Sequence, residues 1–358
     1  MDNASKSILE DYDKQYSTYS TFSKKLSEVI SEIINQQGIK IHSITSRIKE
    51  RNSLNEKLER KNNKYTHLFD VTDIAGIRII TYFADDVDKI AEIIKKEFNI
   101  DKENSIDKRK MEPDRFGYLS LHYIVELKEN RCDLPEYKLF SGLKAEIQIR
   151  SLLQHGWAEI EHDWGYKQNA IPEDMRREFS ILAGTLELVD KEFMNLRDRI
   201  TKRREQVKKQ INKNSKSIII DETSLSVFLE TSEIYKKINE KILQMTCIND
   251  FKQKGNVNLN DNIKMLEYCN IKYIDKLEEN LNKFQDTICK FIKQSIYGKI
   301  GYIIKTSGIL MLCYILCTKD NKLETIRGLL DVGNGSFPID KRDEFASYLL
   351  DCYKKIKD

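Results

Sequence analysis

Two carboxylates lie in or beside strand-like segments, where they could hold a metal ion or a substrate hydroxyl. Asp73 lies just before the β-branched and aromatic run at 76–83, and Glu146 lies within the alternating run at 143–150. Mg²⁺ prefers one or two carboxylates combined with substrate phosphates. If the two strands are neighbours, the pair predicts a magnesium–phosphate site. The alternative is a turn residue and an unrelated surface residue.

A basic segment precedes these carboxylates in the chain. Residues 40–64 hold eight Lys and Arg against three Glu, a net charge of +5. Arginine offers phosphate oxygens a planar fork, and lysine offers them a point charge. The residues that could hold phosphates are Arg47, Lys49, Ser53 and Lys57. The alternative is a solvated helix face, which is the commoner origin of an isolated charge run.

An aromatic side chain and a histidine share one face of the alternating run at 118–127. Tyr118 and His122 lie on this face, while largely apolar residues occupy the other. Stacking of a base on an aromatic ring is worth about 1–3 kcal/mol and tolerates any base. A base-binding tyrosine therefore competes with the simpler interpretation of an exposed tyrosine at the end of a strand.

A predicted helix follows the last strand-like run. His155, Glu159 and His162 share one of its faces, at spacings i, i+4 and i+7. Their order, HxxxExxH, differs from the HExxH motif of zinc enzymes. We therefore expect this face to line a cleft with polar groups rather than to bind a metal.

A sheet and flanking helices are needed to position these side chains. The runs at 76–83, 118–127 and 143–150 are expected to be strands. Residues 85–98 are expected to be a helix, with acids in its first turn and lysines near its end. Because Glu146 and its alternate neighbours are polar, the strand pattern alone favours a solvent-facing antiparallel sheet.

Long helices are expected elsewhere, because the chain has only four prolines and 14 glycines. Residues 1–64, 151–216 and most of 217–358 look helical. Apolar residues from 179 to 200 repeat at 3-4-3-4 spacing, which predicts a helix packed on the body of the protein, with a dimeric coiled coil as the alternative. The apolar run at 308–317 is shorter than the roughly 20 residues of a membrane span, so we expect a buried helix.

Composition limits the class of protein. The 358 residues include 60 Lys and Arg against 57 Asp and Glu, and this near-balance excludes a globally basic nucleic-acid coat and an acidic disordered tail. Such a length predicts about two domains. None of the seven cysteines forms a CxxC pair, which argues against a zinc site or a disulfide framework. With no secretory signal pattern, a cytoplasmic location is expected.

The order of these segments resembles the RelA/SpoT synthetase family, the enzymes that make the alarmone (p)ppGpp. The resemblance covers roughly residues 20–200 and is most specific in EIQIR…QHGWAEIEH. It implies an α+β fold, a mixed β-sheet flanked by helices as in nucleotidyltransferases, followed by a mostly helical C-terminal domain. The expected domains are 1–205 and 206–358, the second open to a regulatory or partner-sensing role.

The resemblance also implies an activity and assigns residues to it. Family members transfer the β,γ-pyrophosphate of ATP to the ribose 3′-oxygen of GDP or GTP and release AMP. By the family pattern, Glu146 is the catalytic glutamate, and it shares Mg²⁺ with Asp73. The ATP-binding set is Arg47, Lys49, Ser53, Lys57 and Arg78, and the acceptor-binding set is Tyr118, His122, Gln148, Arg150 and His155.

One loop departs from the family pattern and leaves the acceptor open. Residues 113–122 read PDRFGYLSLH, whereas many alarmone synthetases carry Lys-Pro-Asn-Gly-Tyr here. The loop resembles that of toxic small alarmone synthetases, a branch that includes enzymes acting on the 3′ end of tRNA. The stretch 196–216, with a net charge of +7, could contact RNA or be a solvated helix end.

Further alternatives concern partners. A non-catalytic nucleotide- or RNA-binding regulator is a third hypothesis, which the intact Asp73, Tyr118 and Glu146 argue against. A homo-oligomer and a regulatory partner for the C-terminal domain both stay open. No membrane partner is expected.

Overall fold

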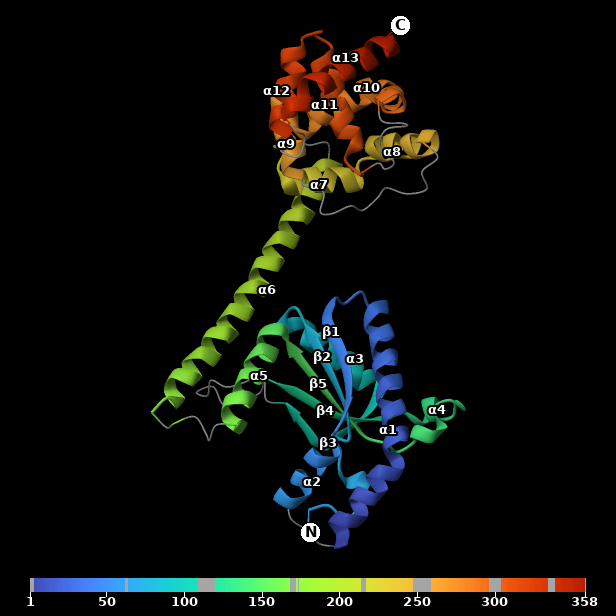
Figure 1. Cartoon of the computed structure of the whole chain (residues 1–358), viewed down its shortest axis with the longest axis vertical. Coiled ribbons are helices and arrows are strands. Elements are labelled where there is room, and N and C mark those ends of the chain that lie inside the picture. Colours follow the sequence, from blue (N-terminus) through green and yellow to red (C-terminus); the bar gives the residue numbers. More distant parts are fainter. Residues whose placement is uncertain are drawn as a thin grey trace. The chain divides into compact units, whose positions relative to one another are not determined.

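The computed structural model describes residues 3–61, 64–107, 120–167, 172, 174–213, 217–246, 259–295, 304–333 and 339–357. They form two compact units, unit 1 (Met1–Arg197) and unit 2 (Asp198–Asp358), coloured by sequence in Figure 1. Each unit has a hydrophobic core of its own. Within the described parts of the chain, no helix combines the length and the apolar character needed to cross a membrane.

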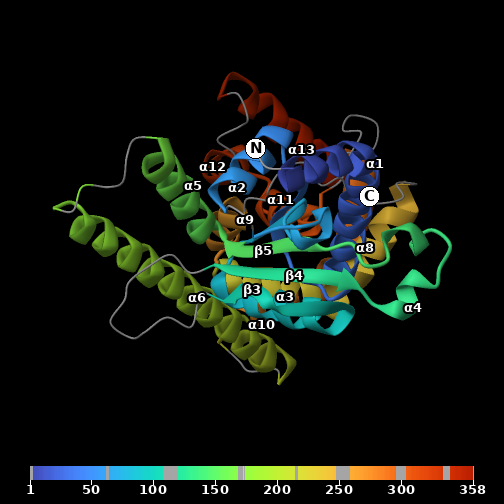
Figure 2. The ribbon, with the colours of Figure 1, turned by 90° about the horizontal axis from the view of Figure 1, so that it is seen from below.

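Five strands form the sheet of unit 1: β1 (Ile41–Ile48), β2 (Ala75–Thr81), β3 (Phe98–Asp107), β4 (Leu121–Leu127) and β5 (Ala145–Ser151). Their order across the sheet is β1-β2-β5-β4-β3, and Figure 2 shows β5, β4 and β3 following one another. β2 and β5 run parallel, while the other neighbours are antiparallel. The sheet is therefore mixed, as the family resemblance implied.

Different helices cover the two faces of the sheet in unit 1. The helices are α1 (Asn3–Gln36), α2 (Arg51–Arg60), α3 (Ala84–Glu97), α4 (Glu129–Cys132) and α5 (Leu152–Lys167), with 3₁₀ turns at Leu68–Asp70 and Lys138–Phe140. α1 and α3 pack on the face where alternate residues of β2 and β5 are buried and apolar. α5 contacts the same two strands, and Figure 1 shows it on the other side of the sheet from α1. The face away from α1 and α3 is polar.

The polar face is less open than the alternating pattern suggested. Gln148 and Arg150 are buried, each with less than a tenth of its surface exposed. The expectation of a solvent-facing antiparallel sheet is therefore wrong. A parallel neighbour and the helix α5 enclose these side chains, so they must find partners within the protein.

The strand β1 corrects the expectation that residues 1–64 are helical throughout. Its sequence, IHSITSRI, pairs with β2 in antiparallel register at one edge of the sheet. Isoleucine and threonine favour extended backbone, and an edge strand needs burial on one side only. The exposed polar residues that suggested a helix are the outer positions of this strand.

Unit 2 is an assembly of helices around one buried helix. The elements are α7 (Glu222–Thr231), α8 (Glu233–Thr246), α9 (Leu259–Tyr268), α10 (Ile274–Ser295), α11 (Ser307–Thr318), α12 (Leu323–Gly333), a 3₁₀ turn at Ile339–Lys341 and α13 (Arg342–Lys357). α11 contains the apolar run 308–317 and packs against α10, α12 and α13. Its residues are buried almost throughout, which confirms the expected buried helix.

The position of Leu312 at the centre of this core allows a stability prediction. Its side chain is completely buried, so Leu312→Ala is expected to lower the free energy of unfolding of unit 2 by about 2–5 kcal/mol. The measurement is urea unfolding of the full chain followed by far-UV circular dichroism. Leu323→Ala, at a half-exposed position of α12, is the matched control. Equal effects of the two variants would contradict this account of the core.

The long helix α6 (Arg176–Asn212) begins in unit 1 and continues past residue 197, through the boundary expected at 205. It carries the predicted apolar repeat, which packs on the body of unit 1 only in part. Ala183 and Asp190 are the buried positions. Two members of the repeat pack on α5: the ring of Phe179 lies 4.2 Å from that of Trp157, and Leu186 lines a cavity with Trp157. The other five are between 37% and 53% exposed, and they are Leu182, Val189, Phe193, Leu196 and Ile200. The helix therefore contacts the body of unit 1 through the first part of the repeat and the adjoining Ala183 and Asp190.

Candidate active site

Four predicted site residues meet on the polar face of β4 and β5. Alternation along β5 places Glu146, Gln148 and Arg150 on this face, opposite the buried alanine and isoleucines. In the antiparallel register with β4, His122 lies directly beside Gln148. The structure thus brings the proposed catalytic glutamate together with three residues that the family resemblance assigns to the acceptor.

Both carboxylate oxygens of Glu146 take part in hydrogen bonds. Oε1 lies 2.9 Å from Nδ1 of His122, and Oε2 accepts a hydrogen bond of 2.8 Å from Nε2 of Gln148. Burial raises the pKa of Glu146, but the hydrogen bonds from His122 and Gln148 outweigh it and leave this pKa below its ordinary value. Glu146 is therefore an ionised carboxylate with a fixed direction.

Arg150 determines which nitrogen of His122 carries the proton. Its Nη2 lies 3.3 Å from Nε2 of His122. A guanidinium only donates hydrogen bonds, so Nε2 of His122 is the acceptor in this contact. The proton is then on Nδ1, where it is donated to Glu146. Arg150, His122 and Glu146 form a chain of hydrogen bonds with one consistent direction.

Asp73 lies between two lysines. Its Oδ2 is 3.1 Å from Nζ of Lys49, which follows β1, and its Oδ1 is 2.8 Å from Nζ of Lys57 on α2. Burial raises the pKa of Asp73, but the two ammonium groups outweigh this and lower it. The charge of Asp73 in turn acts to raise the pKa of Glu146, so the two carboxylates are close enough to interact.

The missing side chain at Gly76 leaves room for the side chain of Arg47 on the neighbouring strand. Gly76 pairs with Arg47 of β1 on one side and with Glu146 of β5 on the other. A Cβ atom at Gly76 would lie 3.2 Å from both Cγ and Nε of Arg47, so the arginine would have to shift. The glycine of the DIAGIR segment therefore has a local role that its sequence context does not indicate.

Arg78 and His155 meet at a shared carboxylate on α5. Oε1 of Glu159 lies 3.1 Å from Nη1 of Arg78 and 3.5 Å from Nδ1 of His155. Burial, followed by the charge of Arg78, lowers the pKa of His155. The residues that the structure describes include no group of three or more His, Cys, Asp and Glu side chains placed to hold a metal. The HxxxExxH face thus makes polar contacts to the sheet.

Two predicted residues stand apart from these clusters. Ser53 is exposed in the first turn of α2, one turn before Lys57. Tyr118, the predicted stacking residue, lies outside the described residues. Its assignment, like the assignment of ATP and acceptor roles to the other residues, stays a prediction.

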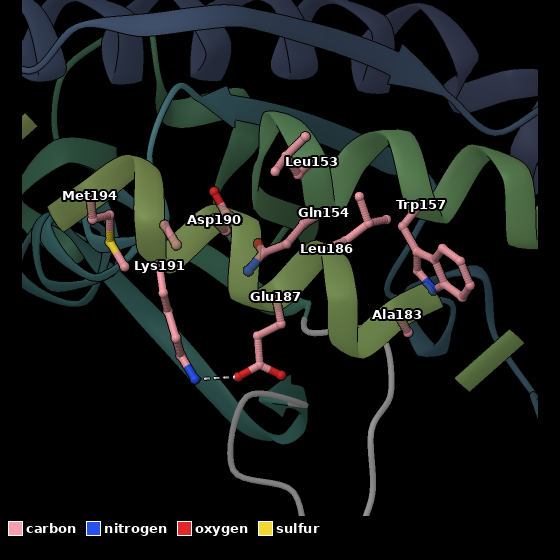
Figure 3. Close-up of a pocket in the computed structure, with 10 residues that line it drawn as sticks. Leu153, Gln154, Trp157, Ala183, Leu186, Glu187, Asp190, Lys191 and Met194 are labelled. Carbon is pink, nitrogen blue, oxygen red and sulfur yellow. Dashed lines mark hydrogen bonds and ion pairs between the residues drawn. The ribbon is translucent and has the colours of Figure 1, made fainter. Parts of the chain in front are cut away.

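The structure also contains a contact that no sequence pattern indicated. Ser151, the last residue of β5, donates a hydrogen bond to the buried carboxylate of Asp190 on α6. Burial raises the pKa of Asp190. Asp190 lines a small, largely apolar cavity of about 100 Å³ between α5 and α6, shown in Figure 3. The contact joins residues 39 positions apart, which is beyond the reach of local periodicity.

The pKa of Glu146 yields a pH prediction. Gln148→Met removes one of the two hydrogen bonds to the carboxylate, while burial continues to favour the protonated form. The pKa of Glu146 is therefore expected to rise, and the acid limb of the kcat/KM profile should move to higher pH by about one unit. Gln36→Met is the matched control, because Gln36 donates a similar bond to Glu32 at an exposed position. Equal profiles for the wild type and Gln148→Met would contradict the assignment.

The part of the chain that contains these site residues is similar in sequence to known proteins. Residues 46–171 match the profile described as "Region found in RelA / SpoT proteins". The chain is 31% identical over 167 residues to GTP pyrophosphokinase YjbM of Bacillus subtilis, an alignment that covers 45% of this chain and 74% of YjbM. It is 28% identical over 208 residues to GTP pyrophosphokinase YwaC of the same organism, covering 54% of this chain and 94% of YwaC.

A solved structure gives a similar match. The crystal structure of small alarmone synthetase 1 from Bacillus subtilis has 25% sequence identity and a TM-score of 0.46, over 54% of this chain and 99% of that protein. The profile match ends before unit 2 begins. The profile match to residues 46–171 and the 31% identity to YjbM show that this chain belongs to the RelA/SpoT family.

Proposed function

We propose that the chain is an ATP-dependent pyrophosphotransferase whose acceptor is the ribose 3′-hydroxyl of GDP or GTP. The observation that carries the proposal is the carboxylate of Glu146, ionised, held on both oxygens and close to the lysine-bound Asp73. Membership of the RelA/SpoT family supports the reaction type, since both curated relatives are GTP pyrophosphokinases.

In this proposal Glu146 acts on the attacking hydroxyl. A general base must be ionised before it accepts a proton, and the lowered pKa keeps Glu146 ionised at neutral pH. As the 3′-oxygen bonds to the β-phosphorus of ATP, its proton passes to Glu146. The bond from the β-phosphorus to the bridging oxygen of the α-phosphate breaks, and AMP leaves. His122 and Gln148 stabilise the carboxylate in the direction that this transfer requires.

The cations around the carboxylates would bind the phosphates of ATP. Lys49 and Lys57 each have three donors, so each can retain Asp73 and still reach a phosphate oxygen. Arg47, lying over Gly76, and Arg78, held by Glu159, extend the positive surface across β1 and β2. Charge on the transferred group is stabilised by such fixed donors, which supply most of the catalysis in phosphoryl transfer.

Asp73 and Glu146 suit a magnesium ion. Both are ionised oxygen donors that interact electrostatically, and Mg²⁺ commonly takes one or two carboxylates with substrate phosphates. When bound, the ion would neutralise phosphate charge during the transfer. The protein itself supplies two oriented carboxylates and the surrounding lysines.

The 3′ end of tRNA is the second candidate acceptor, favoured by the basic stretch at 196–216. Two of its arginines are engaged within unit 2: Arg203 pairs with Asp221, and Arg204 pairs with Glu230 at 2.9 Å. These ion pairs reduce the charge that RNA would meet. The stretch has seven further Lys and Arg, so tRNA stays the second candidate acceptor.

The test is an assay with ATP labelled in the γ-phosphate and Mg²⁺, with GDP, GTP, ATP and deacylated tRNA as parallel acceptors. We expect label in a 3′-pyrophosphorylated guanine nucleotide and AMP in equal amount. Label on tRNA alone would replace this proposal by the second candidate. A folded protein that binds ATP but labels no acceptor would be a non-catalytic regulator.

A further inference from the structure

We propose that Tyr12 of α1 is a positioning residue for ATP, and that it acts by fixing the main chain of Lys49. The inference rests on the proposed function, which assigns Lys49 to the phosphates of ATP. Tyr12 lies outside residues 46–171, which match the family profile, and outside the set of residues that the family resemblance assigns. It belongs to the helix that covers the apolar face of the sheet.

The main chain of Lys49 is held at both of its polar atoms. Lys49 lies in the short link between β1 and α2, and such a link lacks the repeated hydrogen bonds of a strand or a helix. Its N–H donates a hydrogen bond of 2.9 Å to the carbonyl of Ile74, and its carbonyl accepts a hydrogen bond from the hydroxyl of Tyr12. Ile74 directly follows Asp73, whose carboxylate pairs with Nζ of Lys49. The main chain and the side chain of Lys49 are thus both aligned with residues 73 and 74, and Tyr12 completes this set of contacts.

Tyr12 can hold this carbonyl because its ring is fixed and its hydroxyl keeps its proton. The side chain is 3% exposed and belongs to the core of unit 1. Burial, as the largest cause, raises the pKa of Tyr12 above its ordinary value. The hydroxyl is therefore a donor throughout the neutral range of pH. Tyr12 presents this donor at a constant place beside the link, because α1 packs against β1, β2 and α2 (Figure 1).

Two further contacts join α1 to the same basic segment, and both are weaker. Nε of Arg51 lies 3.0 Å and 3.1 Å from the two carboxylate oxygens of Asp13, but both side chains are about half exposed, and exposed ion pairs contribute little. Oγ of Ser23 lies 3.5 Å from the carbonyl oxygen of Arg47, which is at the limit of a hydrogen bond. Tyr12 therefore makes the strongest of these three contacts.

Loss of the Tyr12 hydroxyl would leave the carbonyl of Lys49 without its donor. The link could then rotate about the hydrogen bond to Ile74, and the ammonium group of Lys49 would no longer meet the phosphates in one position. Binding of ATP would have to restore that position, and this cost lowers the affinity. The hydrogen bonds of Glu146 lie on β4 and β5 and share none of these contacts. The acceptor side of the site should therefore be unaffected.

The first test is the dissociation constant of α,β-methylene-ATP, whose α,β bridge cannot be cleaved, measured by titration calorimetry on the full chain with Mg²⁺. Tyr12→Phe keeps the ring and removes the hydroxyl, and this constant should rise about three- to tenfold, the equivalent of one hydrogen bond. The KM for the acceptor should stay at its wild-type value. Tyr16→Phe is the matched control, because Tyr16 lies on the same helix with about half of its surface exposed. An unchanged dissociation constant in folded Tyr12→Phe would overturn the inference.

A double variant tests whether Tyr12 acts through Lys49. Lys49→Met removes the ammonium group, so adding Tyr12→Phe to it should change the dissociation constant of the analogue by less than about twofold. An equal rise with and without the ammonium group would show a general effect of α1 on the fold and would contradict the inference.

The labelled-ATP assay keeps this inference separate from the proposed function. A wild type that binds the analogue but labels no acceptor would remove the proposed function, while the dissociation constants would still decide the role of Tyr12. A wild type that fails to bind the analogue would overturn both.

Discussion

Replacing Glu146 with glutamine is expected to reduce kcat by about 10²–10⁴-fold, the range typical of general acid–base catalysis. Glutamine keeps the size of the side chain and its hydrogen bond with His122, but it cannot accept the proton of the attacking hydroxyl. The KM for ATP should change little, because the phosphates are assigned to Lys49, Lys57 and the arginines. The measurement is a steady-state assay of AMP release with the preferred acceptor.

The control for this variant is Glu126→Gln. Glu126 lies on β4, on the same face of the sheet as His122, and its side chain is about one-third exposed. The same loss of charge there should leave kcat within about twofold of the wild type. If Glu146→Gln retained more than a tenth of the wild-type kcat, a different group would have to receive the proton.

Asp73→Asn is expected to lower kcat/KM by about 10²–10³-fold. The substitution removes the charge that neutralises Lys49 and Lys57 and that would hold Mg²⁺ with Glu146. The Mg²⁺ concentration for half-maximal activity should therefore rise. Asp133→Asn, at an exposed position after α4, is the matched control and should behave as the wild type. An unchanged Mg²⁺ requirement would show that Asp73 does not bind the metal.

The same variant has a stability effect whose dependence on pH can be stated. Because the folded-state pKa of Asp73 is lowered, its ion pairs stabilise the native state above the ordinary carboxyl pKa of about 3.9. This stabilisation is lost as the pH falls through the lowered value. Asp73→Asn should thus reduce the free energy of unfolding at pH 7, and the difference from the wild type should shrink below about pH 4. A difference that is constant with pH would exclude the charge as its cause.

Local patterns in the sequence predicted the elements whose period is clear. The central strands β2 and β5, the helix α3 and the buried helix α11 follow from β-branched runs, alternation, charged helix ends and a continuous apolar run. β1 was missed because an edge strand with exposed Ser, Thr and Arg has the composition of a polar helix face. The family resemblance supplied the mixed sheet, since strand order depends on partners distant in the sequence.

The candidate site was predictable in its residue types but not in its pairings. Glu146 and Asp73 stand out as carboxylates beside strands, whereas the Arg150–His122 bond requires the register of β4 against β5. Glu159 was seen as one member of a histidine face, and its contact with Arg78 appears only when α5 is placed against β2. Such contacts between elements leave no periodic signal in the chain.

The parallel pairing of β2 with β5 has a consequence for the synthesis of the protein. β2 is an interior strand of the sheet, and its parallel partner β5 emerges about 70 residues later, with Ala75 pairing with Ala145. Pairings over long separations form slowly, and an unpaired apolar strand edge favours aggregation. The nascent chain therefore carries an open β2 edge until β5 has left the ribosome. Since β5 also carries Glu146, completion of the sheet and arrival of the proposed base are the same event.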